Sequence, residues 1–584
     1  MTIEERFQNL KSVDDRERFV LAPARLVKTW GSLENTATLL AEGKSQVPMN
    51  GPLTPAGVLS PTILKNDGGD HAAFLLDFRR EMHGTFRLYF GVPDVKFEDG
   101  IDGSSNPNVG GGGAKQAKVR IRLGESISEA LTPVGGPKNA TNNHAVRDAD
   151  FLISAMSILE TAESGFRFAY VELLNDHAVL PVHVAEAVLI VYDLPRLGSF
   201  RSDDPRLDKI YDTAAWTLQL NLQRYLWDGI KRDRLVWMGD MNTEIKTALT
   251  LYGTSAVIKR SLDYMRDTTP IDEWMNGISS YSVWWVICHA DYFMATDDLT
   301  YLKEQREYLL ALMKKLASRV LPDGSEDLPG FKFIDWPNQA SPEATHAGLQ
   351  GILSLGLQKG AFMLETLGEN ETATLCRAAE EKLHHHIPDP MGSKQAAAFL
   401  SLSGVGDRQK LFDSVIAPGG AKGYSTFLGY YTLTAAALAG GYDVAMKSML
   451  DYWGGMLDMG ATSFWEDFNV DWMENAYGID SLPVEGKKDI HGDFGGYCYI
   501  GLRHSLCHGW SSGPVTYISE NVLGVKFLAP GGKKVKIEPH LSHLHFCEGS
   551  VPTAYGVIYV KHEKQPDGTV KSEIALPFGV ERVE

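Results

Sequence analysis

The sequence predicts a multidomain α and β protein, in which a β-rich part, a long helical part and a small β-rich part follow one another. Three observations predict this order. Apolar residues alternate with polar ones before residue 200, recur at helical spacing from about 202 to 524, and alternate again after 524. The expected domains are therefore residues 1–200, 201–524 and 525–584. The β-α-β alternation that is typical of a parallel sheet is absent from the sequence.

The N-terminal part is predicted to be a β-sandwich. Its clearest strand alternates Val119, Ile121 and Leu123 with basic residues. The expected strands, which share this alternation, are 85–92, 118–126, 166–174 and 178–194, the last with a bend at Pro181. Loops rich in Gly, Asn and Pro lie between them, at 99–113 and 131–143. Short strands joined by such loops favour two packed sheets.

The helical part begins near residue 202, where Asp203 or Asp204 can cap a helix and Pro205 suits its first turn. Apolar residues then keep a helical period from Leu207 to Tyr225. Further helical segments are expected at 241–264, 281–295, 299–319, 346–367, 371–386, 407–416 and 430–439. Many of them form pairs, which fits an α/α toroid. A helical solenoid is the alternative, but no repeat of fixed period is present.

The C-terminal part returns to the period of two. Residues 533–539, 556–563 and 570–577 are expected to be strands, and residues 565–568 (QPDG) have the composition of a turn. This part is predicted to be a small β domain.

Composition narrows the class of function. Among 584 residues, Lys and Arg number 56 and Asp and Glu number 74, so the formal charge is −18. This acidic balance argues against a nucleic acid, an anionic membrane or a polyanionic polymer as partner. Five cysteines form no disulfide framework, and neither a signal peptide nor an apolar run of spanning length is visible. We expect a cytoplasmic protein, although a secreted protein that had lost its leader would look the same.

Three common signatures are present but incomplete. Gly509 to Gly513 matches the G-x-S-x-G pattern of serine hydrolases, but the required order of Asp and then His after Ser511 is missing. His384, His385 and His386 are consecutive, so on a helix they point in different directions. The metal-capable residues Cys498, His504, Cys507 and His508 match no structural zinc spacing, and buried thiols are the simpler interpretation.

The densest candidate site is the loop at residues 227–240, where three carboxylates and two tryptophans lie between two helices. One interpretation is a salt-bridged connector in which Arg232 and Arg234 neutralise Asp228 and Asp233. The tryptophans favour a sugar site instead, because an indole ring packs on C–H faces while carboxylates accept hydroxyl hydrogens.

Three further segments place tryptophan beside polar groups at loops: residues 333–337, 460–468 and 505–510. A buried tryptophan with a capping acid would explain each of them separately. A toroid, however, gathers such loops at one end, where they form a funnel. Cleavage of a glycosidic bond needs two carboxyl groups that face each other across a sugar, and separate loops can supply them.

At these motifs the chain resembles glycoside hydrolase family 78, the inverting α-L-rhamnosidases. The family loop D-x-P-x-R-[DE]-x-x-x-W-x-G-D matches residues 228–240 in register. The family segments G-A-T-x-x-W-E, D-W and S-L-x-H match residues 460–466, 335–336 and 505–508. The resemblance implies an N-terminal β-sandwich, a central six-hairpin α/α barrel and a small C-terminal β-sandwich.

The resemblance also implies roles for these residues. Asp233 would be the general acid and Glu466 the general base of an exo-acting enzyme that releases terminal α-L-rhamnose. The implied substrate-binding residues are Asp228, Arg232, Trp237, Asp240, Asp335, Trp336 and His508. No cofactor or metal is implied, and the expected partner is a small rhamnoside, with a homo-oligomer as a further option. Inversion would place the two catalytic carboxyls ~6.5–9.5 Å apart.

The acid must hold its proton near neutral pH, so its pKa must be raised. Repulsion from Asp228 and Asp240 and desolvation by Trp237 would raise it. Arg232 and Arg234 would oppose this effect, so we expect their guanidinium groups to point away from Asp233.

The chain departs from the family pattern at two positions. Asp233 stands where many members carry Glu, and Ile230 stands where the loop usually has Pro. Activity on another sugar, a different carbohydrate chemistry on the same scaffold, and non-catalytic carbohydrate binding are the alternatives. Asp467, Glu474 and Glu485 lie close to Glu466 in sequence and compete with it for the role of base.

Overall fold

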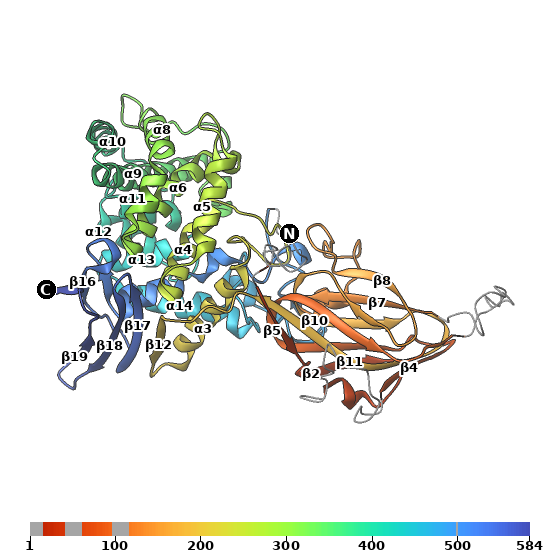
Figure 1. Ribbon diagram of the computed structural model, residues 1–584. Helices are drawn as coiled ribbons and strands as arrows, with labels where there is room; N and C mark the ends of the chain where they lie inside the picture. The colour runs from red at the N-terminus through yellow and green to blue at the C-terminus, as the bar shows by residue number, and fades with distance from the viewer. Residues whose placement is uncertain (1–13, 15, 41–60, 96–115, 498–499) are drawn as a thin grey trace, which may run out of the picture. The chain divides into compact units, whose positions relative to one another are not determined.

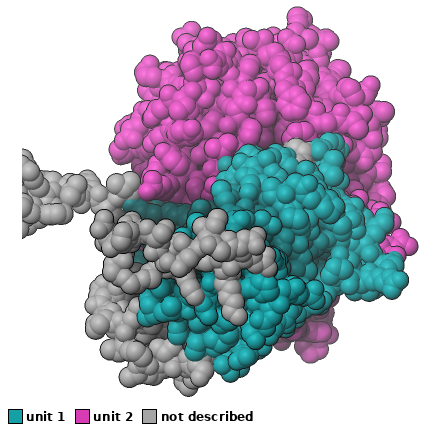
Figure 2. Space-filling view, turned by 90° about the vertical axis from the view of Figure 1, so that its right-hand side faces the viewer, with its two compact units in different colours: residues 1–193, 230–233, 476–505 teal, residues 194–229, 234–475, 506–584 magenta. Residues whose placement is uncertain are grey.

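The computed structural model describes residues 14, 16–40, 61–95, 116–497 and 500–584, so the predicted loop at 99–113 lies outside the described residues. The chain divides into two compact units (Figure 2). The first, which we call the sheet unit, comprises residues 1–193, 230–233 and 476–505. The second, the helical unit, comprises residues 194–229, 234–475 and 506–584.

The sheet unit is built around an 11-stranded antiparallel sheet with the main order β3-β4-β11-β5-β10-β7-β8 (Figure 1). The strands are β1 (Glu17–Leu21), β2 (Arg25–Trp30), β3 (Ser32–Glu34), β4 (Thr62–Asp67), β5 (Ala73–Phe90), β6 (Asp94–Val95), β7 (Ala117–Gly124), β8 (Asp148–Ile153), β9 (Ile158–Glu160), β10 (Ser164–Leu173) and β11 (His177–Val191). A short helix, α2 (Ile127–Leu131), follows β7, and β13 (Ala476–Tyr477) pairs with β14 (Lys488–Asp489).

Strand β5 changes partners along its length. Its first part, Ala73–Asp77, pairs with β2 and β10, and its last part pairs with β11 and β9. Between them Arg79 has a positive φ of 69°. Both parts of β5 are buried on both faces, so this long strand runs through the core of the sheet unit. The expected bend at Pro181 is displaced, since the register of β11 with β5 shifts between Val182 and Val184.

Six helices of the helical unit form a closed ring, in which each packs against the next and the last packs against the first. In chain order they are α4 (Met241–Tyr252), α6 (Ser279–Thr296), α9 (Pro342–Thr366), α11 (Lys394–Ser403), α13 (Gly429–Leu438) and α15 (Pro514–Tyr517). The intervening helices are α3 (Pro205–Asn221), α5 (Ala256–Thr268), α7 (Leu299–Glu304), α8 (Arg306–Ala317), α10 (Asn370–Leu383), α12 (Arg408–Leu411) and α14 (Tyr442–Asp458). This arrangement is an α/α toroid.

Several predicted helices differ from the observed ones for local reasons. The segment 241–264 is divided, because Gly253 ends α4 with a φ of 78° and the Ser255 side chain caps α5. The segment 299–319 is divided into α7 and α8, and 407–416 is α12 followed by a π-helical turn. The predicted cap is correct, since the Asp204 side chain accepts hydrogen bonds from the first turn of α3. That helix ends at Asn221, before Tyr225.

The C-terminal strands form two small sheets in the helical unit. One has the order β12-β17-β18-β19, and the other has the order β15-β16-β20. Their bounds are β12 (Ser199–Ser202), β15 (Val525–Phe527), β16 (Lys534–Ile537), β17 (Phe546–Thr553), β18 (Gly556–Lys564), β19 (Val570–Ala575) and β20 (Glu581–Val583). Strand β12 thus belongs to the C-terminal sheet, and the two compact units cut the chain differently from the three expected ranges. Among the described residues, no helix is long and apolar enough to cross a membrane.

Candidate active site

The candidate residues of the helical unit lie at one end of the ring. Consecutive ring helices are joined through at least one intervening helix, so they run in the same direction and their N-terminal ends gather together. Asp240 directly precedes α4, Tyr281 lies in the first turn of α6, and Asp335 and His508 lie in the loops that lead to α9 and α15. Helix N-termini favour negative charge, so this end suits a group of carboxylates.

Three carboxylates surround the imidazole of His508. Its Nε2 atom lies 3.6 Å from Oε1 of Glu466, 3.8 Å from Oδ2 of Asp240 and 3.9 Å from Oδ2 of Asp228. None of these four side chains is more than 5% exposed. The structure therefore brings together two predicted sugar-binding acids, the predicted base and the predicted histidine from three separate stretches of the chain.

Asp228 closes the loop that separates it from Asp240. The backbone N–H of Asp228 donates to the carbonyl of Leu235, and the N–H of Leu235 donates to Oδ1 of Asp228. The carbonyl of Asp228 accepts from the N–H of Gly509, next to His508. These bonds fix one oxygen of the carboxylate and leave Oδ2 directed at His508.

The W-x-G-D part of the loop is held against aromatic rings. Asn276 accepts a hydrogen bond from the N–H of Met238 and donates one to the carbonyl of Val236. A Cβ atom at Gly239 would lie 2.3 Å from the Tyr281 ring, so only glycine permits this approach. The hydroxyl of Tyr281 donates to Oδ1 of Asp240 at 3.5 Å.

The two predicted substrate-binding tryptophans, Trp237 and Trp336, belong to one row of aromatic rings. Trp237 meets Tyr281 edge-on at 6.3 Å between ring centroids, Tyr281 meets Phe333 at 6.1 Å, and Phe333 meets Trp336 at 5.1 Å. This row joins the loop before α4 to the loop before α9, so it positions both tryptophans relative to Asp240.

The backbone around Glu466 is fixed by side chains from two other loops. Its carbonyl accepts hydrogen bonds from Nε1 of Trp510 at 3.1 Å and from the hydroxyl of Thr426 at 2.6 Å. The Trp510 ring in turn stacks on Phe427 at 4.6 Å and lies 4.1 Å from the ring of His508. The carboxyl group of Glu466 is thus held next to His508 by a preorganised shell.

Two further acids near the site have raised pKa values. Burial raises the pKa of Asp335 to about 7, although hydrogen bonds to its side chain from Ser425 and from the N–H of Trp336 oppose the shift. Burial and the neighbouring charge of Glu466 raise the pKa of Asp467 to about 6. Asp335 also caps the 3₁₀ turn Trp336–Ala340, which makes it a structural residue of the Trp336 loop.

Glu244 is a functional candidate that the sequence reasoning missed. It lies on α4, four residues after Asp240, and is fully buried. Neither carboxyl oxygen has a hydrogen-bond partner among the described residues, and burial followed by the charge of Asp228 raises its pKa well above the usual value. Its spacing of four from Asp240 on a helix was the available signal.

Asp233 and Arg232 lie in the sheet unit, within the short segment 230–233. Nε2 of His144 lies 3.2 Å from Oδ1 of Asp233, and Nη1 of Arg232 lies 3.7 Å from the same oxygen. The expectation that Arg232 points away from Asp233 is therefore wrong. Arg234 lies over the Trp227 ring at 5.9 Å. The expected separation of Asp233 and Glu466 stays a prediction.

The competing motifs have structural explanations. The buried hydroxyl of Ser511 donates to the carbonyl of His508, and Gly509 is required because a Cβ there would lie 2.0 Å from Oε1 of Glu244. His384 contacts Glu380, whereas His386 contacts His346, so the consecutive histidines do point apart. Of the zinc-capable residues, Cys498 lies outside the described residues.

One group in the described part of the chain has metal-ligand geometry, namely Glu125, Glu129 and His491. The two carboxylates bind the ammonium group of Lys231. The ring nitrogens of His491 lie within hydrogen-bond distance of the Ser126 hydroxyl and the His504 carbonyl. These ligand atoms are therefore engaged by protein groups.

Comparison with known proteins gives consistent results. A family model described as the bacterial alpha-L-rhamnosidase 6 hairpin glycosidase domain matches residues 195–390. An alpha-L-rhamnosidase of Alteromonas sp. (strain LOR) is 24% identical over 91% of this chain, which spans 57% of that relative's length. 

Two solved structures are also similar. The family 78 rhamnosidase of Bacillus sp. GL1 has a TM-score of 0.70 at 18% identity, over 89% of this chain and 55% of that one. The Klebsiella oxytoca rhamnosidase with rhamnose bound has a TM-score of 0.64 at 19% identity, over 86% of this chain and 96% of that one. These similarities confirm the multidomain fold with its six-hairpin helical domain.

The motif resemblance, the matched domain and the shared fold agree: residues 195–390 match the six-hairpin rhamnosidase domain, and the chain is similar in fold to the rhamnosidases of glycoside hydrolase family 78.

Proposed function

We propose that this chain is an inverting exo-α-L-rhamnosidase that releases terminal rhamnose from small rhamnosides. The observation that supports it best is the convergence of Asp228, Asp240 and Glu466 on His508 at the N-terminal end of the helical ring. A buried group of three acceptors and one imidazole suits a polyhydroxylated ring, which offers several hydroxyl donors at fixed spacing. The Alteromonas relative and the two similar structures described above are named as rhamnosidases.

The proposed binding step uses the carboxylates and the aromatic row. Asp228 and Asp240 accept hydrogens from sugar hydroxyls, and His508 contacts the sugar between them. Trp237 and Trp336 offer apolar faces to its C–H groups. Arg232 and Asp335 position other residues of the site. Arg232 lies against the Asp233 carboxylate, and Asp335 caps the turn that carries Trp336.

In the proposed chemical step, Asp233 donates a proton to the glycosidic oxygen as the bond to the anomeric carbon breaks. Glu466 removes a proton from a water molecule that attacks that carbon from the opposite face. The product is rhamnose of inverted anomeric configuration. Asp233 then regains a proton from solvent and Glu466 loses one.

The test uses p-nitrophenyl α-L-rhamnoside with the wild type, Asp233→Asn and Glu466→Gln. We expect each variant to lose ~10²–10⁴-fold in kcat, because general acid and base catalysis contribute about that much. Proton NMR during the first minutes should show β-L-rhamnose before mutarotation. Full activity in either variant removes its assigned role, and initial α-L-rhamnose rules out inversion. Asp471→Asn, at an exposed salt bridge with Lys422, is the matched control.

A further inference from the structure

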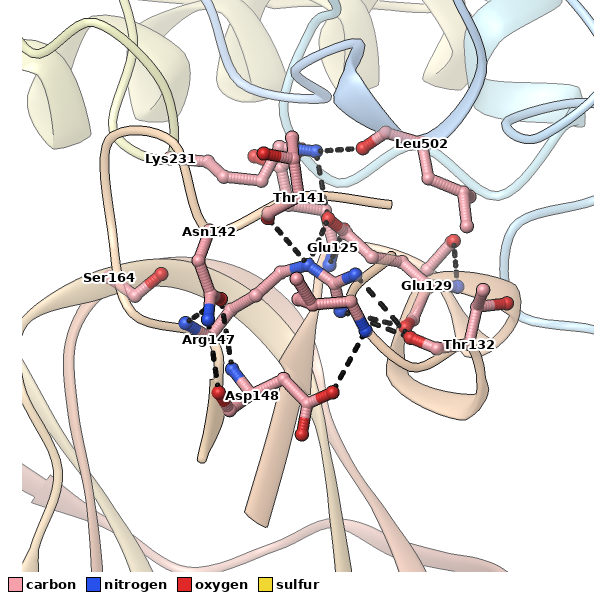
Figure 3. A network of polar contacts seen from close by, with 12 residues as sticks. Glu125, Glu129, Thr132, Thr141, Asn142, Arg147, Asp148, Ser164, Lys231 and Leu502 are labelled. Atoms are coloured by element: carbon pink, nitrogen blue, oxygen red, sulfur yellow. Dashed lines mark hydrogen bonds and ion pairs between the residues drawn. The ribbon is translucent and has the colours of Figure 1, made fainter. Parts of the chain in front are cut away.

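The segment that carries Asp233 is anchored inside the sheet unit. Lys231, two residues before Asp233, is buried, and its Nζ contacts Glu125 Oε2 at 3.0 Å and Glu129 Oε1 at 3.1 Å (Figure 3). The same ammonium donates to the carbonyls of Leu502 and His504. Burial opposes the charge on Lys231, but the two carboxylates outweigh it and raise its pKa. Lys231 is thus a charged, fully bonded anchor.

The backbone of this segment also lies directly against strand β10. A Cβ atom at Gly165 would lie 2.7 Å from the Ile230 side chain and 2.9 Å from the backbone nitrogen of Lys231. Only a glycine allows the segment to approach the strand so closely. The segment that carries Asp233 is therefore fixed to the sheet unit twice, by the side chain of Lys231 and by its backbone next to Gly165.

A second loop of the sheet unit, residues 141–148, is fixed by the same network. Arg147 donates to the carbonyls of Thr141, Glu129 and Thr132 (Figure 3). Oδ1 of Asn142 accepts from the N–H groups of Arg147 and Asp148, and its amide donates to the Asp148 carbonyl. The loop is held in one conformation, although it has no regular secondary structure between residues 141 and 147.

Glu129 links the two loops. Its Oε1 atom lies 3.1 Å from Nζ of Lys231 and 3.5 Å from Nε of Arg147. The second carboxyl oxygen of Glu129 accepts a hydrogen bond from the N–H of Glu125, so both oxygens of this carboxylate have protein partners. The loop that carries His144 and the segment that carries Asp233 therefore share one buried anchor, which fixes the distance between them.

The result of this anchoring is the contact between His144 and Asp233. Nε2 of His144 and Nη1 of Arg232 both approach Oδ1, at 3.2 and 3.7 Å. Asp233 and Arg234 both have positive φ values, 56° and 53°, which is a costly conformation for two consecutive residues other than glycine. The chain thus adopts an unfavourable local conformation that places Oδ1 close to these two nitrogens.

We propose, given the rhamnosidase function above, that His144 is a positioning residue for the acid Asp233. Its Nε2–H donates to Oδ1, so that the catalytic proton resides on Oδ2, from which it passes to the leaving oxygen. After the transfer, the same donor stabilises the carboxylate. The sheet unit thereby takes part in leaving-group protonation, and His144 matters most for leaving groups that depend on it.

Basic side chains are frequent around His144. With it, four cationic side chains and one carboxylate line a small cavity of about 10 Å³: Arg147, Lys231, Arg232, Arg503 and Glu129. Asp233 faces it as the second acid.

The experiment compares His144→Ala and His144→Gln with the wild type on 2,4-dinitrophenyl, p-nitrophenyl and methyl α-L-rhamnosides. A dinitrophenolate leaves without protonation, whereas methoxide does not. We expect His144→Ala to lose ~10–100-fold in kcat on the methyl glycoside but less than about 3-fold on the dinitrophenyl glycoside, because only the methyl glycoside needs the acid. The KM of the variant should stay unchanged, since the sugar contacts are not altered. The amide N–H of His144→Gln should restore part of the loss.

The matched control is His71→Gln, since His71 also contacts carboxylates of the sheet unit, Glu172 and Asp176. Circular dichroism melting checks that each variant folds. An equal loss on all three substrates, or no loss on the methyl glycoside, overturns the inference while the proposed function stands. A wild type that hydrolyses none of the three rhamnosides overturns the proposed function and this inference with it.

Discussion

Nε2 of His508 lies 3.6 Å from Oε1 of Glu466, and both side chains are almost completely buried. Two more carboxylates, those of Asp228 and Asp240, lie within 4 Å of the same nitrogen. The imidazole therefore lies between three buried carboxylates that would otherwise repel one another. Its removal should affect both the binding of the sugar and the stability of the site.

We predict that His508→Ala lowers kcat/KM about 10- to 100-fold, since a hydrogen bond to a charged group contributes ~1.5–3 kcal/mol. Initial rates on p-nitrophenyl α-L-rhamnoside measure the effect. His385→Gln, at an exposed position, is the control and should keep wild-type rates. Activity of His508→Ala within a factor of two of the wild type would contradict a role in sugar contact.

Gly239→Ala should damage the loop that carries Asp240. Its new methyl group would meet the Tyr281 ring at 2.3 Å, and either the ring or the loop must move. We expect a loss of about 1–3 kcal/mol in the free energy of unfolding, the usual cost of overpacking, together with reduced kcat. Urea denaturation measures the first effect. Gly69→Ala, where a Cβ has open space, is the comparison, and an equal effect there would argue against the clash.

Lys231→Met tests the anchor of the Asp233 segment. Removing one partner leaves the buried carboxylates of Glu125 and Glu129 uncompensated, which typically costs about 3–5 kcal/mol. Thermal melting should show a clear decrease in Tm. Lys447→Met removes an exposed pair with Asp451 and should change stability by less than about 0.5 kcal/mol. Similar melting curves for the two variants would show that the anchor carries no net stabilisation.

The raised pKa of Asp335, about 7, predicts a pH dependence of stability. A buried acid with a raised pKa stabilises the fold fully below its unfolded pKa of about 4, and this contribution is lost as the pH rises to about 7. Asp335→Asn should lack this loss, so its stability relative to the wild type should increase between pH 4 and 7 by a few kcal/mol. Guanidinium denaturation at pH 5, 6 and 7.5 measures the difference. A constant difference would contradict the shift.

The residues that converge on His508 were predictable from the sequence because their motifs lie in loops that connect helices. Asp240 directly precedes α4, and Glu466 and His508 lie in the long loop before α15. Once a ring of helices is expected, such loops must meet at one end. The tryptophans were predictable for the same reason, whereas Tyr281 and Asn276, which hold them and the loop, belong to stretches without an evident motif.

The sequence pattern predicted some helices less well. Helix α11 was missed because it is buried on all sides, so its apolar residues show no amphipathic period. Helices α4 and α5 were merged, since one glycine and one capping serine are small interruptions of a strong periodic pattern. The contact of His144 with Asp233 was not predictable, because it follows from the pairing of Lys231 with Glu129. These two residues are about a hundred positions apart in the sequence, so no local motif indicates their contact.

Because the four residues 230–233 fold with the sheet unit, the proposed acid Asp233 belongs to a different compact unit from the proposed base Glu466. A shortened enzyme that begins near residue 194 would retain the acids around His508 while the Asp233 segment lost its anchors at Glu125 and Glu129. In chimeras between homologues, exchange of the N-terminal portion should therefore change the preference for the aglycone. Exchange of the helical portion should change the recognition of the glycone. The two specificities can then be engineered separately.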